Sequence, residues 1–295
     1  MVASLVVSVS VPALALISAL LSAIATILIR HGLVRHSAYT GFWINLVVGT
    51  VCLWIAVPLT GGLGRPTPQA VLLFVLAGLI GTVAGRLLRF FSIEIVGASI
   101  TAGFMNVTPL VSSALAILLL GEQLTGPIVL GTLVIVVGST LLSSGGQRLG
   151  LRPAQLLLPA LSATCFGVVA ILRKLGLSGM GAVPGTAVNV TTALVAFTGF
   201  LMASGQGGAM SCRGRSLVYF IAAGVAENVS VFLVVVALGM GAVSVVAPLQ
   251  NVTPIFVLFL SVVFLRGIEA LNARVVAGTV LIVLGAYLIT ALGSR

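Results

Sequence analysis

Two ionisable side chains stand deep inside long apolar runs of this sequence. Arg86 lies within residues 69–93, and Glu227 lies within residues 216–239. An arginine near the middle of a bilayer costs roughly 2.5–3.5 kcal/mol even on the mildest insertion scale, so its guanidinium must face a cavity or a partner. Two roles are therefore open for Arg86. It holds an anionic group of a ligand, or it pairs with Glu227 and stabilises the helix bundle.

Glu227 is the one carboxylate well inside an apolar run, and Asn228 follows it. It is the natural partner for Arg86 if the two runs face each other. It is also a candidate for proton coupling, because a buried carboxyl can exchange a proton at physiological pH. One carboxylate is too few for a divalent-cation site, which needs several oxygen ligands. Arg89 and Glu94 are expected nearer the membrane surface, where the side chain of Arg89 can extend to water.

An Asn-Val-Thr-Pro sequence occurs twice, each time in the middle of an apolar run, and ends at Pro109 and at Pro254. Proline lacks a backbone N–H, so the carbonyl four residues earlier, at Met105 or Gln250, loses its helical partner. In lipid, such a carbonyl must be satisfied by protein or by a water-filled cavity. A duplicated helix break at mid-membrane depth points to a transport site. Five polar side chains around the prolines can satisfy these carbonyls or line a cavity: Asn106, Thr108, Gln250, Asn251 and Thr253.

The composition predicts an integral membrane protein. Of 295 residues, 60% are hydrophobic and 6% are charged, and the mean hydropathy is +1.31. A soluble protein of this length has roughly a quarter charged residues. The net charge is +10, but the basic residues stand one or two at a time between apolar runs, as do Arg173 and Lys174. We interpret them as loop residues that face lipid head groups, whereas a nucleic-acid-binding protein would gather them on one polar face.

Ten apolar segments are long enough to cross a bilayer as helices. Because the first of them has a counterpart in the second half of the chain, we interpret it as a retained helix and not as a signal peptide. The predicted fold is an all-α, polytopic membrane protein. The ten segments span about residues 9–29, 40–60, 69–93, 98–120, 127–144, 154–173, 184–203, 216–239, 242–265 and 273–292.

The two halves of the chain match each other at a nearly constant shift, which indicates an internal duplication. We place the repeats at residues 1–147 and 148–295. Each repeat holds five segments, an odd number, so the second enters the membrane in the opposite sense and the two form an inverted-topology repeat. The matched pairs include Gly32 and Gly176, Gly41 and Gly185, Asn45 and Asn189, Phe74 and Phe220, and Gly78 and Gly224.

Other matched residues have structural interpretations. Asn45 and Asn189 are expected to form interhelical hydrogen bonds. Glu122 and Glu269 stand just before the fifth and tenth segments, where a carboxylate favours the positive end of the following helix. Glycines spaced by seven residues give each of these two helices a stripe of small residues for close packing. They are Gly131 and Gly138 in the first repeat, and Gly278 and Gly285 in the second.

Together these features resemble the drug/metabolite transporter superfamily, in its ten-helix type with two EamA-like domains. The resemblance implies a central cavity between the first four helices of each repeat, alternating access and cytoplasmic termini. It also implies export or exchange of small metabolites, amino acids among them. In the first half it rests on Gly97-Ala98-Ser99, on Thr108-Pro109, and on Leu120-Gly121-Glu122 with Gly131 and Gly138. In the second half it rests on Gly241-Ala242, Thr253-Pro254, Glu269, Gly278 and Gly285.

Three functions are compatible with the sequence. The first is a secondary transporter of small polar organic solutes, an exporter or exchanger whose cavity is lined by Arg86, Glu227, Asn228 and the residues around the two prolines. The second is a carrier of anionic solutes, such as phosphorylated metabolites or lipid-linked phosphates, held by Arg86 and Arg89. The third is a membrane scaffold without transport, against which the duplicated helix breaks argue. The sequence has no enzyme, metal-ligand or ATP-binding motif, so we expect neither catalysis nor a cofactor.

The expected partners are a small-molecule substrate and membrane lipids, and not nucleic acid. Transport would be proton-coupled or passive, and the protein a monomer or a homodimer. We expect a multi-pass protein of the prokaryotic inner (plasma) membrane. Two arguments give opposite orientations. Eight basic loop residues lie on the side away from the termini and four on the side of the termini, which predicts external termini, whereas the resemblance implies cytoplasmic ones.

Overall fold

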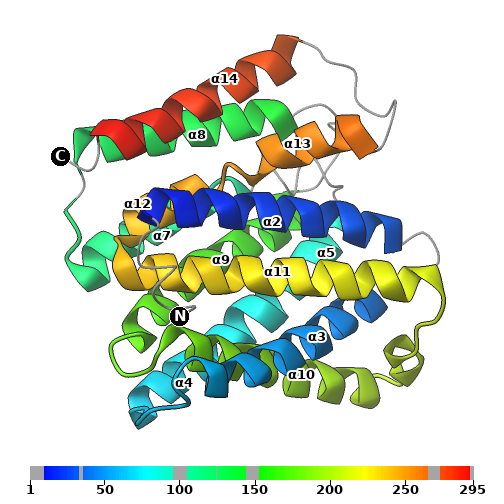
Figure 1. Cartoon of the computed structure of the whole chain (residues 1–295). Helices are drawn as coiled ribbons and strands as arrows, with labels where there is room; N and C mark the ends of the chain where they lie inside the picture. The colour runs from blue at the N-terminus through cyan, green and yellow to red at the C-terminus, as the bar shows by residue number, and fades with distance from the viewer. Residues whose placement is uncertain are drawn as a thin grey trace.

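The computed structural model describes residues 10–32, 36–95, 105–123, 125–143, 153–264 and 273–292. Their regular structure is helical throughout (Figure 1), which confirms the predicted all-α fold of two inverted repeats. The first repeat contains α2 (Val11–Gly32), α3 (Ala38–Leu59), α4 (Pro68–Ala77), η1 (Gly78–Gly85), α5 (Arg86–Ile95), α7 (Thr108–Leu120) and α8 (Gly126–Ser143). The second contains η3 (Pro153–Leu156), α9 (Leu157–Gly176), α10 (Ala182–Ala203), η4 (Gly207–Met210), α11 (Arg215–Met240), α12 (Val243–Gln250), α13 (Thr253–Phe264), α14 (Ala273–Tyr287) and η5 (Leu288–Leu292).

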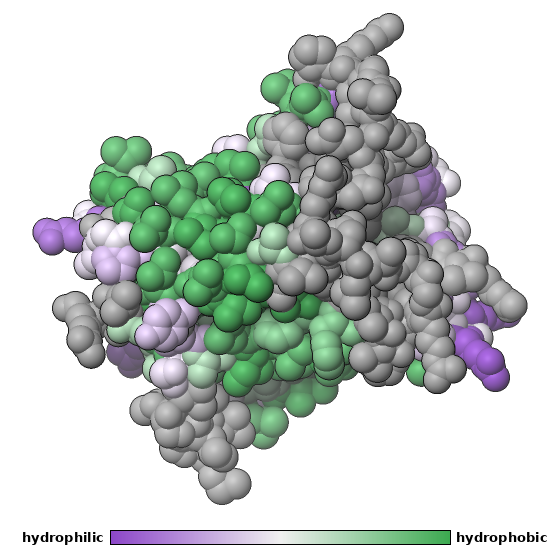
Figure 2. Space-filling view, turned by 90° about the horizontal axis from the view of Figure 1, so that it is seen from above, coloured by the Kyte–Doolittle hydropathy of each residue, from purple (hydrophilic) through white to green (hydrophobic). Residues whose placement is uncertain are grey.

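Much of the outer surface is apolar, as a bilayer requires. Six helical stretches of the described residues are long and apolar enough to cross a membrane. They are α2, α3, the continuous stretch from α4 into α5, α9, α10 and α11. Large apolar side chains such as Leu59, Leu118 and Val195 are exposed on them or on α7, and Figure 2 shows apolar side chains gathered over one face of the molecule. So much exposed apolar surface marks contact with a membrane.

The two Asn-Val-Thr-Pro sequences fall at helix breaks. In the second repeat, α12 ends at Gln250 and α13 begins at Thr253. In the first repeat, α7 begins at Thr108 and the proline follows at once, where its missing N–H costs no helical bond. The Gly97-Ala98-Ser99 start of the predicted fourth segment lies outside the described residues. The predicted fourth and ninth segments thus each contain a shorter helix after the break.

Two buried phenylalanines link the repeats symmetrically. The ring of Phe220, from α11, packs on two glycines of the first repeat, and the ring of Phe74, from α4, packs in the same way on two glycines of the second. A Cβ atom on any of these glycines would collide with a ring carbon. The sequence match therefore has a packing reason, because each ring fills a gap in the opposite repeat. The glycines are Gly32 and Gly41 against Phe220, and Gly176 and Gly185 against Phe74.

Helices α8 and α14 lie side by side at one edge of the bundle (Figure 1). A Cβ atom on Gly131 would lie 2.7 Å from the carbonyl oxygen of Gly285, and one on Gly138 would lie 2.7 Å from that of Gly278. Backbones this close tolerate no side chain between them. The predicted stripes of small residues are confirmed as the contact between these two helices.

Helices α2 and α11, one from each repeat, run together through the middle of the bundle (Figure 1). The Ser18 hydroxyl donates to the carbonyl of Ser230 at 3.0 Å, and the Ser230 hydroxyl donates to the carbonyl of Ser18 at 2.8 Å. Both serines are buried, so the exchange satisfies polar groups that lipid could not. This contact holds the helix that carries Glu227 against the first repeat.

Candidate functional site

The chain changes helix type just before Arg86. Residues Gly78–Gly85 form a π-helix, η1, and the N–H of Arg86 donates to the carbonyl of Gly81, five residues earlier. The apolar run of residues 69–93 predicts a regular α-helix here. A Cβ atom on Gly78 would lie 2.5 Å from the carbonyl oxygen of Asn189, so the glycines let η1 touch the neighbouring helix. π-Helical turns often occur at functional sites, and this one sets the position of the Arg86 side chain.

Arg86 and Glu227 form an ion pair across the two repeats. The distance from Arg86 Nη2 to Glu227 Oε1 is 3.2 Å, and the two side chains are 19% and 20% exposed. The hydroxyl of Ser22 lies 3.4 Å from the other carboxylate oxygen. The guanidinium carbon stands 5.6 Å from the ring centre of Phe42, in cation–π contact. The structure thus brings together the two ionisable residues that the sequence singled out, and leaves both partly accessible.

Asn228 fixes the surroundings of this pair and is itself buried. Its Nδ2 donates to the carbonyls of Gly224 at 2.7 Å and Asn45 at 3.1 Å. Asn45 Oδ1 accepts a longer bond, 3.5 Å, from Arg86 Nη1. The predicted interhelical bonding of Asn45 is therefore present, and Asn228 acts here as a positioning residue behind the ion pair. A Cβ atom on Gly49 would overlap the Asn228 amide, so this glycine makes room for it.

A similar arrangement surrounds Asn189, the counterpart of Asn45. Asn189 Oδ1 accepts hydrogen bonds from Arg173 Nε at 3.3 Å and Nη2 at 3.2 Å. Its Nδ2 donates to the hydroxyl of Thr82 at 2.9 Å. Thr82 and Asn228 are separated in sequence by the same number of residues as Phe74 and Phe220. The match between the two repeats therefore continues along η1.

The interpretation of Arg173 and Lys174 as loop residues facing lipid head groups is wrong. Helix α9 continues to Gly176, and both side chains turn into the protein. Lys174 Nζ donates to the carbonyls of Leu238 at 2.6 Å and Gly241 at 2.7 Å, at the end of α11. Arg173 is half-buried and interacts electrostatically with both charges of the ion pair. The interpretation was wrong because the two residues stand at the end of an apolar run, where basic residues usually lie at the membrane surface beside lipid head groups.

The two helix breaks meet each other. Asn251 Nδ2 donates to Asn106 Oδ1 at 3.4 Å, as the inverted repeat predicts. The Thr253 hydroxyl donates to the carbonyl of Gln250 at 2.7 Å, which satisfies the group that proline leaves free. Its counterpart Thr108 differs: among the described residues neither its hydroxyl nor Asn106 Nδ2 has a hydrogen-bond partner, although both are buried. The side chains of Gln250 and Asn251 are half-buried, and that of Pro254 lies outside the described residues, while Pro109 is buried.

Ser162 of α9 lies between the ion pair and the helix breaks. Its hydroxyl donates to the carbonyl of Gly85 at 2.8 Å, directly before Arg86, and lies 3.5 Å from the sulfur of Met105, directly before Asn106. The two groups of candidate residues therefore belong to one region of the bundle. Arg89, one turn beyond Arg86, is exposed, and the side chain of Glu94 is outside the described residues.

Glu122 binds a helix N-terminus, but not the predicted one. Its two carboxylate oxygens accept from the backbone N–H groups of Val243 at 2.8 Å and Ser244 at 3.1 Å, at the start of α12. The Ser244 hydroxyl adds a bond of 2.8 Å. The carboxylate stabilises a helix of the other repeat because the chain turns back at Gly121, whose φ is 66°. Glu269 lies outside the described residues.

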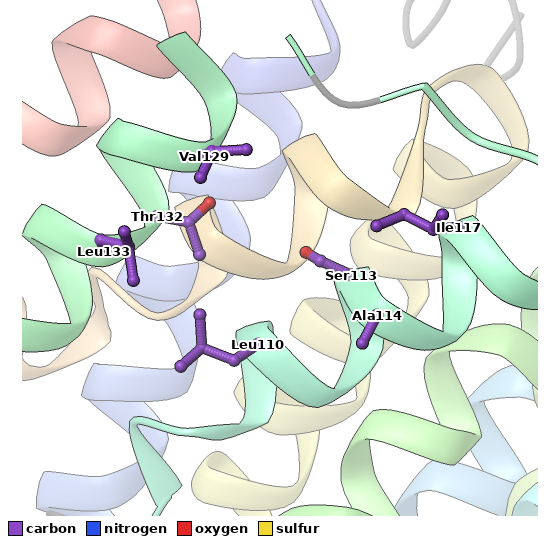
Figure 3. A pocket seen from close by; sticks show the side chains of 7 residues that line it. All are labelled: Leu110, Ser113, Ala114, Ile117, Val129, Thr132 and Leu133. Carbon is purple, nitrogen blue, oxygen red and sulfur yellow. The ribbon is translucent and has the colours of Figure 1, made fainter. Parts of the chain in front are cut away.

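The described residues offer no metal centre, since no three His, Cys, Asp or Glu side chains gather in them. A hollow of about 180 Å³ does lie between α7 and α8 (Figure 3). Apart from Ser113 and Thr132, its lining residues are apolar, and Thr132 already donates to its own helix at Ile128. This hollow is therefore distinct in character from the polar region around Arg86.

The residues that the sequence analysis missed are Ser22, Phe42, Thr82 and Arg173. Thr82 could have been found, because it matches Asn228 at the shift already established for Phe74 and Phe220. Ser22 lies one turn after Ser18 on the face of α2 that meets α11. The direction of Arg173 depends on how α9 packs on α4 and η1, which no local pattern records.

An inverted pair of five-helix repeats with polar, broken helices at its centre defines a membrane transporter fold. The profile of the EamA-like transporter family matches residues 10–144 and again residues 154–291, and the chain belongs to this family. A solved structure described only as the crystal structure of a protein superposes with a TM-score of 0.82 over 96% of this chain and 98% of its own, at 18% identity. That likeness establishes the fold alone. Among curated proteins, none shows significant similarity to the chain.

Proposed function

We propose that the protein is a secondary transporter of small polar organic solutes, amino acids or related metabolites, and that it works as an exporter or exchanger. The observation that carries this proposal is the partly exposed ion pair of Arg86 and Glu227 between the repeats. An ion pair that only held the bundle together would be expected to be fully enclosed. Asn106 Nδ2 and Thr108 Oγ1, which have no hydrogen-bond partner among the described residues, add donors that a polar solute can satisfy.

The chemistry of the pair suits a zwitterion. A carboxylate of the solute can take the guanidinium of Arg86 in a two-point contact, and an ammonium group can take the carboxylate of Glu227. The solute then replaces each partner of the existing ion pair, so neither charge is left alone in the membrane. Asn45 and Phe42 hold the guanidinium in place during the exchange.

Alternating access would move one repeat against the other around this pair. Contacts between the repeats, such as Asn251 with Asn106 and Glu122 with α12, must then differ between the two states. The breaks at the prolines supply bending points, because α12 ends at Gln250 before α13 begins at Thr253, and α7 begins at Thr108. Glu227 is the candidate for proton coupling, and passive exchange is the alternative.

A second candidate is a carrier of anionic solutes. It is favoured by the charge of the region: among the described side chains, Arg89 and Arg173 interact electrostatically with Glu227, which already pairs with Arg86. This excess of positive charge suits a solute with a net negative charge. The two candidates differ in the role of Glu227, which a zwitterion needs and an anion does not.

The experiment is flux into proteoliposomes of labelled alanine, glutamate, glycerol 3-phosphate and glucose. The variants are Arg86→Ala and Glu227→Gln, with Arg213→Ala as a control in an exposed loop. Loss of amino-acid flux in both site variants, but not in Arg213→Ala, supports the zwitterion carrier. Loss of anion flux in Arg86→Ala with anion flux retained in Glu227→Gln supports the anion carrier. Absence of wild-type flux for every solute contradicts both.

A further inference from the structure

We infer that Arg173, held by Asn189 and Thr82, forms a second binding subsite that takes an anionic group of the transported solute, a carboxylate or a phosphate. The inference rests on the transport function proposed above and deepens it. It assigns a role to a residue that the sequence pattern placed at the membrane surface.

The guanidinium of Arg173 is held from one side only. Nε and Nη2 both donate to the single oxygen of the Asn189 amide, at 3.3 and 3.2 Å. Among the described residues, Nη1 has no hydrogen-bond partner. Asn189 is buried and its Nδ2 is engaged by Thr82 at 2.9 Å, so the amide cannot turn away. The result is a fixed cation with donors to spare, which is the geometry that recognises a carboxylate or phosphate.

The subsite lies inside the bundle. Thr82 stands near the middle of the continuous helix that runs from Pro68 to Ile95, and Asn189 stands two turns into α10. Arg173 stands in the last turn of α9, and its side chain extends inward to Asn189. Thr82, which Asn189 bonds, precedes Arg86 by four residues on the same continuous helix, so the group of Arg173, Asn189 and Thr82 lies beside the ion pair. A solute at the ion pair therefore has Arg173 within reach.

Among the described residues, Arg173 has no ion-pair partner of its own. The ion pair of Arg86 with Glu227 is the one salt bridge of the described residues. The C-terminal end of α9 supplies a partial charge of about −0.5, which does not neutralise a full positive charge. Glu227 interacts with Arg173 but is already paired with Arg86, so the charge of Arg173 is only partly offset, and such a charge is costly inside a membrane protein. An anion from solution relieves this cost, so the subsite favours an anionic ligand.

The two repeats can be compared around Asn45 and Asn189, and they differ in whether a carboxylate lies beside the arginine. Asn45 and Asn189 are counterparts, and each presents its Oδ1 to an arginine. Asn228 and Thr82 are counterparts, and each contacts the asparagine of the opposite repeat. Beside Asn45 the protein supplies a carboxylate, Glu227, whereas beside Asn189 it supplies none among the described residues. One half of the site holds its own anion, and the other half is left for the anion of the solute.

The test measures binding without transport. The melting temperature of the detergent-purified protein is followed by the fluorescence of Trp43 and Trp54 while sodium succinate or sodium phosphate is added, against sodium chloride at equal ionic strength. We expect a saturable rise for at least one of these anions in wild type. Arg173→Gln should abolish it, and Arg173→Lys, which keeps the charge but not the fork of donors, should weaken the affinity by about tenfold. The control Arg213→Gln should respond as wild type.

Either an unresponsive wild type or an unchanged response in Arg173→Gln overturns the inference. If Arg173→Gln fails to fold, Arg173→Lys serves as the test. An apparent anion affinity of Arg173→Lys equal to that of wild type then overturns the inference. A third arm adds phosphatidylglycerol in place of the soluble anions. A rise with this lipid alone would identify a head-group site and overturn the solute subsite. Flux in proteoliposomes without anion binding at Arg173 would overturn the subsite but not the transport function. Anion binding at Arg173 without flux would overturn the transport function but not the subsite.

Discussion

The ion pair of Arg86 and Glu227 makes each charge costly to remove alone. Removing one partner of a fully buried pair costs about 3–5 kcal/mol, whereas replacing both by apolar residues is often neutral. The pair here is 19% and 20% exposed, so water screens the remaining charge in part. The unpaired group would still face Asn45 and Phe42 or the hydroxyl of Ser22, none of which carries a compensating charge.

We therefore expect Glu227→Met to lower the free energy of unfolding by about 1–3 kcal/mol, discounted for the exposure of the pair. The double variant Arg86→Met with Glu227→Met should be less destabilised than the sum of the two single variants. The measurement is a double-mutant cycle by reversible unfolding in mixed micelles. Additive losses would show that the two charges do not interact.

The two matched threonines should respond in opposite ways to the loss of a hydroxyl. Thr253 donates to the freed carbonyl of Gln250 at 2.7 Å, so Thr253→Val should cost about 1–2 kcal/mol. Thr108 has a buried hydroxyl without a partner among the described residues, so Thr108→Val should be neutral or stabilising. The same unfolding assay compares the two, and each serves as the control of the other. Equal losses would contradict the assignment of Thr253 to structure and Thr108 to the site.

At the scale of residues, the sequence predicts which oppositely charged side chains pair, but not the direction in which each polar side chain points. Glu227 is the one carboxylate deep in an apolar run, so its pairing with Arg86 follows from elimination and from the cost of a buried charge. The division of work between Thr108 and Thr253 does not follow, because the two sequences around them are identical. Only the packing around each break separates them.

At the scale of elements, glycines decide how closely helices approach. Gly185 and Gly199 both lie in α10, but a Cβ atom on Gly185 would lie 2.8 Å from Cε1 of Phe74, whereas one on Gly199 would meet nothing within 4 Å. The aromatic ring of Phe74 is fully buried and has nowhere to move. The same helix thus contains a glycine that packing requires and one that it does not.

Gly185→Ala should lower the free energy of unfolding by about 1–3 kcal/mol through overpacking. Gly199→Ala should leave it unchanged or raise it by up to about 1 kcal/mol, since alanine has the higher helix propensity. Thermal unfolding of both variants beside wild type checks the pair. A loss in Gly199→Ala as large as that in Gly185→Ala would show that α10 resists alanine for reasons other than the Phe74 ring.

Element order and the approximate bounds of the ten segments follow from apolar length and turn residues, and the matched glycines predict a close-packing face on α8 and on α14. That these two faces meet each other is seen only in the structure. The π-helix before Arg86 does not follow. Its glycines permit several backbone paths, and contacts of η1 with Asn189 and Val169 select one of them. The target of Glu122 was also mistaken, because the nearest helix in sequence is α8, whereas the turn at Gly121 directs the carboxylate to α12.

At the scale of the whole molecule, the hydrogen bonds of Arg173 and Lys174 inside the bundle change the count of basic loop residues on each side of the membrane. The positive-inside rule counts basic residues in short loops, and these two residues bond inside the bundle. Without them, the side of the termini keeps Arg65 and Arg295, against eight basic residues on the other side. The charge argument for external termini becomes stronger, in opposition to the orientation implied by the family resemblance.

Cys212 tests this orientation, because it lies in the loop before α11 on the side that the charge argument places in the cytoplasm. Burial raises the pKa of its thiol, partly offset by a backbone hydrogen bond at Arg213. Less thiolate is therefore present near neutral pH than in a free cysteine, and labelling should accelerate as the pH rises. We expect an impermeant maleimide to label Cys212 in permeabilised cells but not in intact ones.

Two variants make this test decisive. Cys212→Ser should abolish the signal, because Cys52 and Cys165 lie within the membrane helices α3 and α9. On that background, Leu63→Cys places an exposed thiol in the loop on the side of the termini and should be labelled in intact cells. Labelling of Cys212 in intact cells, with Leu63→Cys protected, would reverse the orientation. The cytoplasmic side would then be the one that keeps only Arg65 and Arg295 as basic loop residues, so something other than loop charge would have to direct insertion.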